Sequence, residues 1–247
     1  MESTFHWTQL LNPEFYINLE IGGVPVGIYV VLFIVFAETG LFAGFFLPGD
    51  SLLFLAGIYS KELMNTVVPI EGDFINVALL ALLVALSGIL GNSFGYWFGY
   101  KSGSFLYNKK DSFWFKKKYL IQSHDFFEKH GGRAIIFARF FPVIRTFAPI
   151  VAGIVKMEKK KFMLFNIISS FLWAFTLIFA GHYLYELFLS KFNIDLKSYI
   201  EYIILIIVAI TTVPLVINAI KGKKVTEQEA IEEEAKNPGD HKPTNEA

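Results

Sequence analysis

Three long apolar runs constrain the fold of this chain more than any other feature. They cover residues 74–90, 162–180 and 199–220. A helix rises about 1.5 Å per residue, so about 20 apolar residues cross a hydrocarbon core of about 30 Å. The chain as a whole is 54% hydrophobic and only 18% charged, which is more apolar than soluble domains usually are. We therefore expect an all-α polytopic membrane protein with several transmembrane helices.

The chain divides into three predicted regions. Residues 1–23 mix aromatic and polar side chains, which is typical of an interfacial segment. Residues 24–220 hold the apolar runs and form the predicted membrane domain. Residues 221–247 are polar and mostly acidic after a basic start, and we expect a disordered tail. Lysine and arginine gather in short links on the cytoplasmic side of membrane proteins, and here they gather at 101–133, 156–161 and 221–224. The tail is therefore expected in the cytoplasm.

Several classes of chemistry are disfavoured by the residues that the chain lacks. It contains no cysteine, which excludes disulfides, thiol nucleophiles and iron–sulfur ligation. Its five histidines are scattered without metal-ligand spacing, so we expect neither a metal site nor another cofactor. There is no histidine-centred phosphatase pattern and no aspartate-rich metal motif, so we expect a protein that is not an enzyme. Its net charge of zero gives no reason to expect a nucleic-acid partner.

Two further apolar segments are interrupted. The first, residues 24–47, is followed by Pro48 and Gly49 and then by about ten apolar residues, which are too few to span. The second, residues 133–155, contains Pro142 and Pro149. Non-helical backbone at membrane depth is tolerated only where it is buried in protein or lines a cavity, as in the broken helices of transporters. The pattern predicts two opposed re-entrant helical hairpins arranged as an inverted repeat, with breaks at these four residues.

Four ionisable residues lie inside these interrupted segments: Glu38, Asp50, Arg139 and Arg145. An Arg or Asp facing lipid costs about 2.5–3.5 kcal/mol, so we expect the four to face one another around a polar cavity. The planar fork of arginine suits a phosphate, which makes Arg139 and Arg145 the predicted phosphate-binding residues. A carboxylate in low dielectric can carry a proton, so Glu38 and Asp50 are the predicted proton-coupling residues. The residues alone leave open a simple N-cap at Asp50 and static structural pairs at the arginines.

A stripe of small residues, one at every fourth position, begins in the apolar run at 74–90. It begins at Ser87 and continues through Gly91, Gly95, Gly99 and Gly103. Small residues at this spacing allow close helix packing in lipid. A step of four residues drifts about 40° around a helix, so the stripe wraps around its helix. This favours packing inside one chain, with a homodimer contact as the alternative.

Three motifs in this order resemble the DedA family, a bacterial branch of the VTT-domain superfamily. They are FLPGDS at 46–51, GxxxGYxxGxxxG at 91–103 and RxxPxxRTFxPxxxG at 139–153. The resemblance implies a multi-pass protein of the bacterial inner membrane with two opposed re-entrant hairpins and a role in proton-motive-force-dependent membrane homeostasis. Several members of the family are implicated in flipping lipid carriers such as undecaprenyl phosphate, and others in handling phospholipids. The family's functional residues fall on Glu38, Asp50, Arg139 and Arg145.

The sequence departs from the family pattern at two positions. Many relatives have Asp where this chain has Asn92, and many have Arg where it has Tyr100. The resemblance and the buried charges together predict a flippase-like lipid translocase. Its expected partners are protons and a membrane lipid with an anionic headgroup, either a polyprenyl phosphate or a phospholipid. The alternatives are a proton-coupled antiporter of small solutes or ions, and a structural factor in membrane homeostasis.

Overall fold

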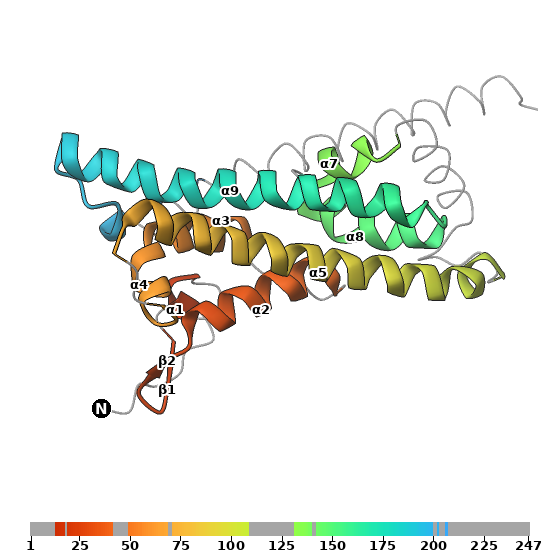
Figure 1. Cartoon of the computed structure of the whole chain (residues 1–247), viewed down its shortest axis with the longest axis horizontal. Coiled ribbons are helices and arrows are strands. Elements are labelled where there is room, and N and C mark those ends of the chain that lie inside the picture. Colours follow the sequence, from red (N-terminus) through yellow and green to blue (C-terminus); the bar gives the residue numbers. More distant parts are fainter. Residues whose placement is uncertain are drawn as a thin grey trace, which may run out of the picture. The chain divides into compact units, whose positions relative to one another are not determined.

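The computed structural model describes residues 13–17, 19–41, 49–68, 71–108, 131–139 and 142–199, with Tyr202 and Ile206. The chain divides into two compact units, Met1–Leu205 and Ile206–Ala247, and every element below belongs to the first. In chain order the elements are α1 (Pro13–Ile17), β1 (Glu20–Ile21), β2 (Val24–Pro25), α2 (Gly27–Gly40), α3 (Gly49–Ile58), α4 (Ser60–Asn65), α5 (Asp73–Asn108), α7 (Arg133–Arg139), α8 (Pro142–Ile154), α9 (Lys159–Phe192) and the 3₁₀ helix η3 (Leu196–Tyr199) (Figure 1). The described part of the chain is thus mainly helical, as predicted.

Two helices are long and apolar enough to cross a membrane. They are α5, with 36 residues, and α9, with 34 residues. Among the described residues, these are the helices that meet the length and composition of a span. They contain the runs predicted at 74–90 and 162–180. The third predicted run, 199–220, and the predicted tail, 221–247, lie almost entirely outside the described residues.

The first interrupted segment is shorter than its apolar run suggests. Residues 24–47 were expected to form one long helical segment, but α2 has only 14 residues and ends where Leu41 turns to extended backbone. Its start is delayed because Val24 and Pro25 belong to strand β2. The next helix, α3, has 10 residues and begins at Gly49. At about 1.5 Å per residue, neither α2 nor α3 crosses a core of about 30 Å. Pro48 lies outside the described residues.

The second interrupted segment breaks once among its described residues and not at both prolines. Helix α7 ends at Arg139, and Pro142 is the first residue of α8, a position where its missing N–H removes no helical bond. The break predicted at Pro149 is wrong, because Pro149 lies inside α8 and the helix continues to Ile154. Proline in a helix interior removes one backbone hydrogen bond; here Pro149 is buried beside Gly95 of α5, and α8 continues past it.

The N-terminal region contains a small ribbon that the sequence analysis did not predict. Strands β1 and β2 pair antiparallel, with Glu20 opposite Pro25 and Ile21 opposite Val24. The turn between them is Gly22-Gly23, and both glycines have positive φ, as two-residue hairpin turns require. The preceding helix, α1, packs on α2, where a Cβ at Gly27 would overlap the backbone of Ile17. Residues 1–12 of the predicted interfacial segment lie outside the described residues.

The long helix α5 packs against α2, α8 and α9 (Figure 1). The glycine stripe makes these close contacts possible. A Cβ at Gly91 would overlap Thr39 of α2, and a Cβ at Gly99 would overlap the backbone of Ile150 in α8. Gly103 faces the backbone of α8 in the same way. Because the stripe drifts around α5, its first glycines pack against α2 and its later glycines against α8.

Helices α3 and α9 approach each other through a second pair of glycines. A Cβ at Gly57 would overlap the carbonyl of Ile178, and one at Gly181 would overlap the carbonyl of Phe54. This contact holds the C-terminal half of α3 against the C-terminal half of α9 and so sets the two helices side by side. It thereby positions Asp50, in the first turn of α3, near Trp173 of α9.

Candidate functional site

The four charged residues come from four different helices, each close to a helix end. Glu38 lies in the last turn of α2, Asp50 in the first turn of α3, and Arg139 at the last residue of α7. Arg145 is the fourth residue of α8. The positive N-terminal end of α3 favours the acid there, and the negative C-terminal end of α7 favours the base. Glu38 and Arg145 lie at the opposite, unfavourable ends of α2 and α8. The helix dipoles therefore favour Asp50 and Arg139, and the other two charges are stabilised by their mutual ion pair.

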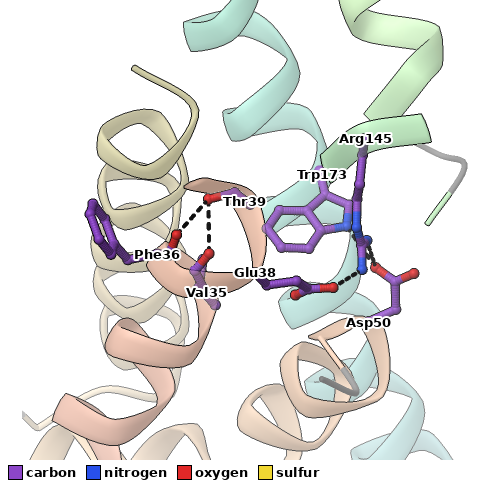
Figure 2. A network of polar contacts seen from close by, with 7 residues as sticks. All are labelled: Val35, Phe36, Glu38, Thr39, Asp50, Arg145 and Trp173. Carbon is purple, nitrogen blue, oxygen red and sulfur yellow. Dashed lines mark hydrogen bonds and ion pairs between the residues drawn. The ribbon is translucent and has the colours of Figure 1, made fainter. Parts of the chain in front are cut away.

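Arg145 joins the two acids. Its Nη1 donates to Oδ1 of Asp50, and its Nη2 donates to Oε1 of Glu38 (Figure 2). The side chains of Arg145 and Glu38 are 4% and 3% exposed, and that of Asp50 is 16% exposed. The three residues therefore form a buried ion-pair cluster, with its most accessible edge at Asp50. These contacts join residues 107 and 95 positions apart in the sequence.

Trp173 of α9 completes this cluster. Its Nε1–H donates to Oδ1 of Asp50 at 2.9 Å. The Cζ atoms of Arg139 and Arg145 lie 4.7 Å and 5.3 Å from the centroid of its ring. Cation–π contacts of this kind are worth about 2 kcal/mol or more where the cation is desolvated. The sequence analysis missed Trp173. Tryptophan in membrane helices is usually enriched near the interfaces, whereas Trp173 lies mid-way along α9. This unusual position could have marked it as a candidate site residue.

Arg139 is buried, with 2% of its surface exposed, but its hydrogen bonding is incomplete. Among the described residues, its Nε and Nη2 have no hydrogen-bond partner. The space for its guanidinium comes from Gly88, where a Cβ would lie 2.5 Å from Nη2. Oε2 of Glu38 and Nε of Arg145 are also without a hydrogen-bond partner among the described residues. The cluster therefore retains buried donors that an oxyanion could use.

A neutral polar network extends from Arg139 along α5 and α9. In one amide orientation, Nδ2 of Asn92 donates to Oδ1 of Asn166 at 2.7 Å. Rotated by 180°, the Asn92 amide donates to the Thr39 carbonyl at 3.3 Å, while its oxygen accepts from Nη1 of Arg139. Nδ2 of Asn166 also lies 3.4 Å from the hydroxyl of Ser93. The orientation of an amide follows from its neighbouring hydrogen bonds, and the rotated orientation is the one that pairs Asn92 with Arg139.

The structure brings all four predicted charged residues into one buried region. Glu38, Asp50 and Arg145 are in direct contact, and Arg139 shares the Trp173 ring with Arg145. Gly49, predicted as a break, starts α3 and lies against the carboxylate of Glu38. Two acids and two bases make the cluster formally neutral, which limits the cost of burying it. Among the described residues, no group of three His, Asp or Glu side chains is suited to hold a metal ion.

Comparison with known proteins gives a consistent set of relatives. A family model described as the VTT domain matches residues 47–183. The chain is 35% identical over 206 residues to Protein DedA of Escherichia coli K12, which covers 83% of this chain and 88% of that protein. It is 38% identical over 189 residues to the uncharacterized membrane protein Rv0364 of Mycobacterium tuberculosis H37Rv (76% and 77%). It is 34% identical over 163 residues to the inner membrane protein YqjA of Escherichia coli K12 (64% and 67%). No solved structure matches.

Proposed function

Because this chain belongs to the DedA family of VTT-domain membrane proteins, we propose that it is a lipid translocase of the cytoplasmic membrane. Its substrate is a lipid with an anionic phosphate headgroup, either a polyprenyl phosphate such as undecaprenyl phosphate or a phospholipid. The observation that carries the proposal is the buried cluster in which Arg145 binds both Glu38 and Asp50. Static pairing alone does not explain the unused donors of the neighbouring Arg139.

The first step of the proposed mechanism is an exchange of partners at the arginines. A phosphate presents several oxygens to the planar fork of a guanidinium, which can donate two parallel hydrogen bonds to it. Arg139 has two donor atoms, Nε and Nη2, that have no hydrogen-bond partner among the described residues and could bind such a ligand. The phosphate then competes with the carboxylates for Arg145. Trp173 lies against both guanidiniums and shields them from solvent during the exchange.

The second step couples lipid movement to protons. A carboxylate that loses Arg145 while it remains buried is destabilised in its charged form and takes up a proton. Glu38 is the more buried of the two acids, and its Oε2 already lacks a hydrogen-bond partner among the described residues. Binding of one phosphate charge is therefore balanced by uptake of one proton, at Glu38 or Asp50. Release of the lipid returns Arg145 to both acids and expels that proton.

The helix breaks provide the elements that move. The acids lie on α2 and α3 and the arginines on α7 and α8, so each charge pair joins one interrupted segment to the other. Exchange of Arg145 between carboxylates and phosphate therefore changes how strongly the two segments are held together. Transporters with broken helices use such rearrangements to open alternately to each side.

The proposal is tested by transport in proteoliposomes that contain a polyprenyl phosphate and carry a pH gradient. We expect the wild-type chain to move the lipid and Arg145→Gln to reduce the rate at least tenfold. Arg133→Gln is the matched control, because Arg133 is exposed at the start of α7. Equal rates for the wild type and Arg145→Gln would remove the ion-pair cluster from the mechanism.

The same buried acids also fit a proton-coupled antiporter of small solutes or ions. Solute-driven proton flux in vesicles without any anionic lipid would favour that alternative. A structural role in the membrane would fit a cluster that never exchanges partners. Activity in cells that survives neutralisation of Glu38, Asp50, Arg139 and Arg145 would favour the structural role.

A further inference from the structure

A pocket of about 670 Å³ lies outside the ion-pair cluster, between the C-terminal half of α5 and the start of α9. In Figure 1 this is the region where α8 turns into α9 beside α5. Three lysines line it: Lys101 from α5, Lys156 from the link between α8 and α9, and Lys159 from the first turn of α9. All three are exposed. Among the described residues, no carboxylate forms an ion pair with any of them.

The pocket has one acidic residue in its lining, and that acid is engaged elsewhere. The carboxylate of Glu158 lies 3.3 Å from Nζ of Lys161, which is not part of the lining. Glu158 precedes α9 and makes no side-chain cap, so it does not satisfy the first N–H groups of this helix. A long helix has a partial positive charge at its N-terminal end. The three lysines and the N-terminal end of α9 therefore give the pocket a positive electrostatic potential.

The walls of the pocket are aromatic and face outward. Trp97 and Tyr100 are 53% and 48% exposed. Behind them, the rings of Tyr96 and Phe162 stack with centroids 4.3 Å apart, and Tyr96 donates its hydroxyl to the Met157 carbonyl at 2.6 Å. Exposed Trp and Tyr in membrane helices mark the level of the lipid headgroups. The pocket thus combines apolar walls at headgroup level with a positively charged rim.

Lys156 has an unusual backbone for its residue type. It adopts the left-handed conformation, with φ of 55°, just after the end of α8. The amide of Met157 bonds to the carbonyl of Ala152 at 2.9 Å, and that of Lys156 to Gly153 at 3.0 Å, which is the pattern of a helix end that normally takes glycine or asparagine. A lysine here is strained. Lys156 is at the same time part of the pocket lining.

We infer that this pocket binds the phosphate headgroup of an anionic membrane lipid, with Lys101, Lys156 and Lys159 around the phosphate and Trp97 and Tyr100 against its first alkyl carbons. Basic pockets between membrane helices bind such headgroups, and the volume lies within the range of ligand sites. The binding does not depend on the proposed transport.

The pocket also adjoins the polar network described above. Ser93 lines the pocket and lies next to Asn166, which contacts Asn92 beside Arg139. If the chain moves lipid, a headgroup bound in the pocket lies at one end of a polar route to the buried arginines. This second role rests on the proposed function, whereas the binding itself does not.

The test is a titration of the purified full chain, in a zwitterionic detergent, with short-chain fluorescent phosphatidic acid. The pocket variant is Lys101→Gln, Lys156→Asn and Lys159→Gln together; asparagine keeps the left-handed backbone accessible at position 156. The control variant is Lys61→Gln, Arg133→Gln and Lys191→Gln, which removes the same charge from exposed residues outside the lining. Each lysine near a headgroup contributes about fivefold to affinity. We expect the pocket variant to bind at least tenfold more weakly and the control variant to bind within twofold of wild type.

A second readout locates the lipid without changing a charge. Brominated phosphatidic acid should quench the tryptophan fluorescence of the wild type more than that of Trp97→Phe, and brominated phosphatidylcholine should not. Equal weakening by the two triple variants, or no weakening by the pocket variant, would overturn the inference. Complete displacement of the lipid by an equal concentration of inorganic phosphate would overturn the assignment to a lipid. Normal binding by a chain that transports nothing would leave this inference standing and remove the proposed function.

Discussion

The carboxylate of Glu38 lies directly against Gly49, so a Cβ at position 49 would overlap its oxygens. This contact joins the end of α2 to the start of α3. Oε1 of Glu38 is thereby directed to Arg145. The glycine of the FLPGDS motif therefore has a packing role as well as its place beside a helix break.

We expect Gly49→Ala to displace Glu38 from Arg145. Overpacking of this kind costs about 1–3 kcal/mol, and the variant should unfold at a lower temperature in detergent and lose transport. Gly95→Ala is the control, since a Cβ there makes only contacts of 3.4 Å or longer. An unchanged melting temperature for Gly49→Ala would contradict the close contact.

Removal of Arg145 should be rescued by removal of its two acids. Arg145→Gln leaves Glu38 and Asp50 buried without this cation, and breaking a buried pair costs about 3–5 kcal/mol. The triple variant Arg145→Gln, Glu38→Gln, Asp50→Asn has neutral side chains of similar size and should recover most of this stability, but no activity. Thermal unfolding of the wild type, Arg145→Gln and the triple variant measures the effect. A triple variant less stable than Arg145→Gln would show that the acids are stabilised by other groups.

Substitutions at Trp173 should separate its two contacts. Trp173→Phe removes the hydrogen bond to Asp50 and keeps an aromatic ring, at a cost of about 1.5–3 kcal/mol for a bond to a charged group. Trp173→Leu also removes the cation–π contacts with Arg139 and Arg145 and should cost about 2 kcal/mol more. The exposed Trp97→Phe should change stability by less than about 0.5 kcal/mol. Equal losses of stability in Trp173→Phe and Trp173→Leu would mean that the cation–π contacts do not stabilise the protein.

An aspartate at position 92 should form an ion pair with Arg139. Asn92→Asp places a carboxylate beside Nη1 of Arg139, whereas Asn166→Asp buries one that contacts no charged residue in the described hydrogen bonds. An unpaired buried charge costs about 3–5 kcal/mol, so we expect Asn92→Asp to be more stable than Asn166→Asp by roughly that amount. Similar melting temperatures for the two variants would show that Arg139 does not pair with position 92.

The glycine stripe allows a test of internal packing against self-association. Gly91→Ala and Gly99→Ala meet Thr39 and the backbone of Ile150, and each should cost about 1–3 kcal/mol. Gly95→Ala has more room and should be neutral or gain up to about 1 kcal/mol in helix propensity. Unfolding temperatures and molecular mass in detergent would be measured together. A change of mass without a loss of stability would favour the homodimer contact.

The sequence by itself determined the helical class, the two long spans and the positions near Gly49 and Pro142 where the apolar segments break. It also identified the four charges, because the cost of a charge in lipid depends on the residue type and on the apolar run around it. These properties are local, so they can be read along the chain. The family motifs pointed to the same residues.

Only the tertiary structure decided how these residues combine. Arg145 takes both acids while Arg139 lies against Trp173 and Asn92, although the sequence makes the two arginines equivalent. Likewise, Pro149 does not break α8 and packs beside Gly95 of α5. The physical reason is distance along the chain: these contacts join different helices, with residues up to 107 positions apart. Their geometry depends on how closely the glycines let α2, α8 and α9 approach their neighbours.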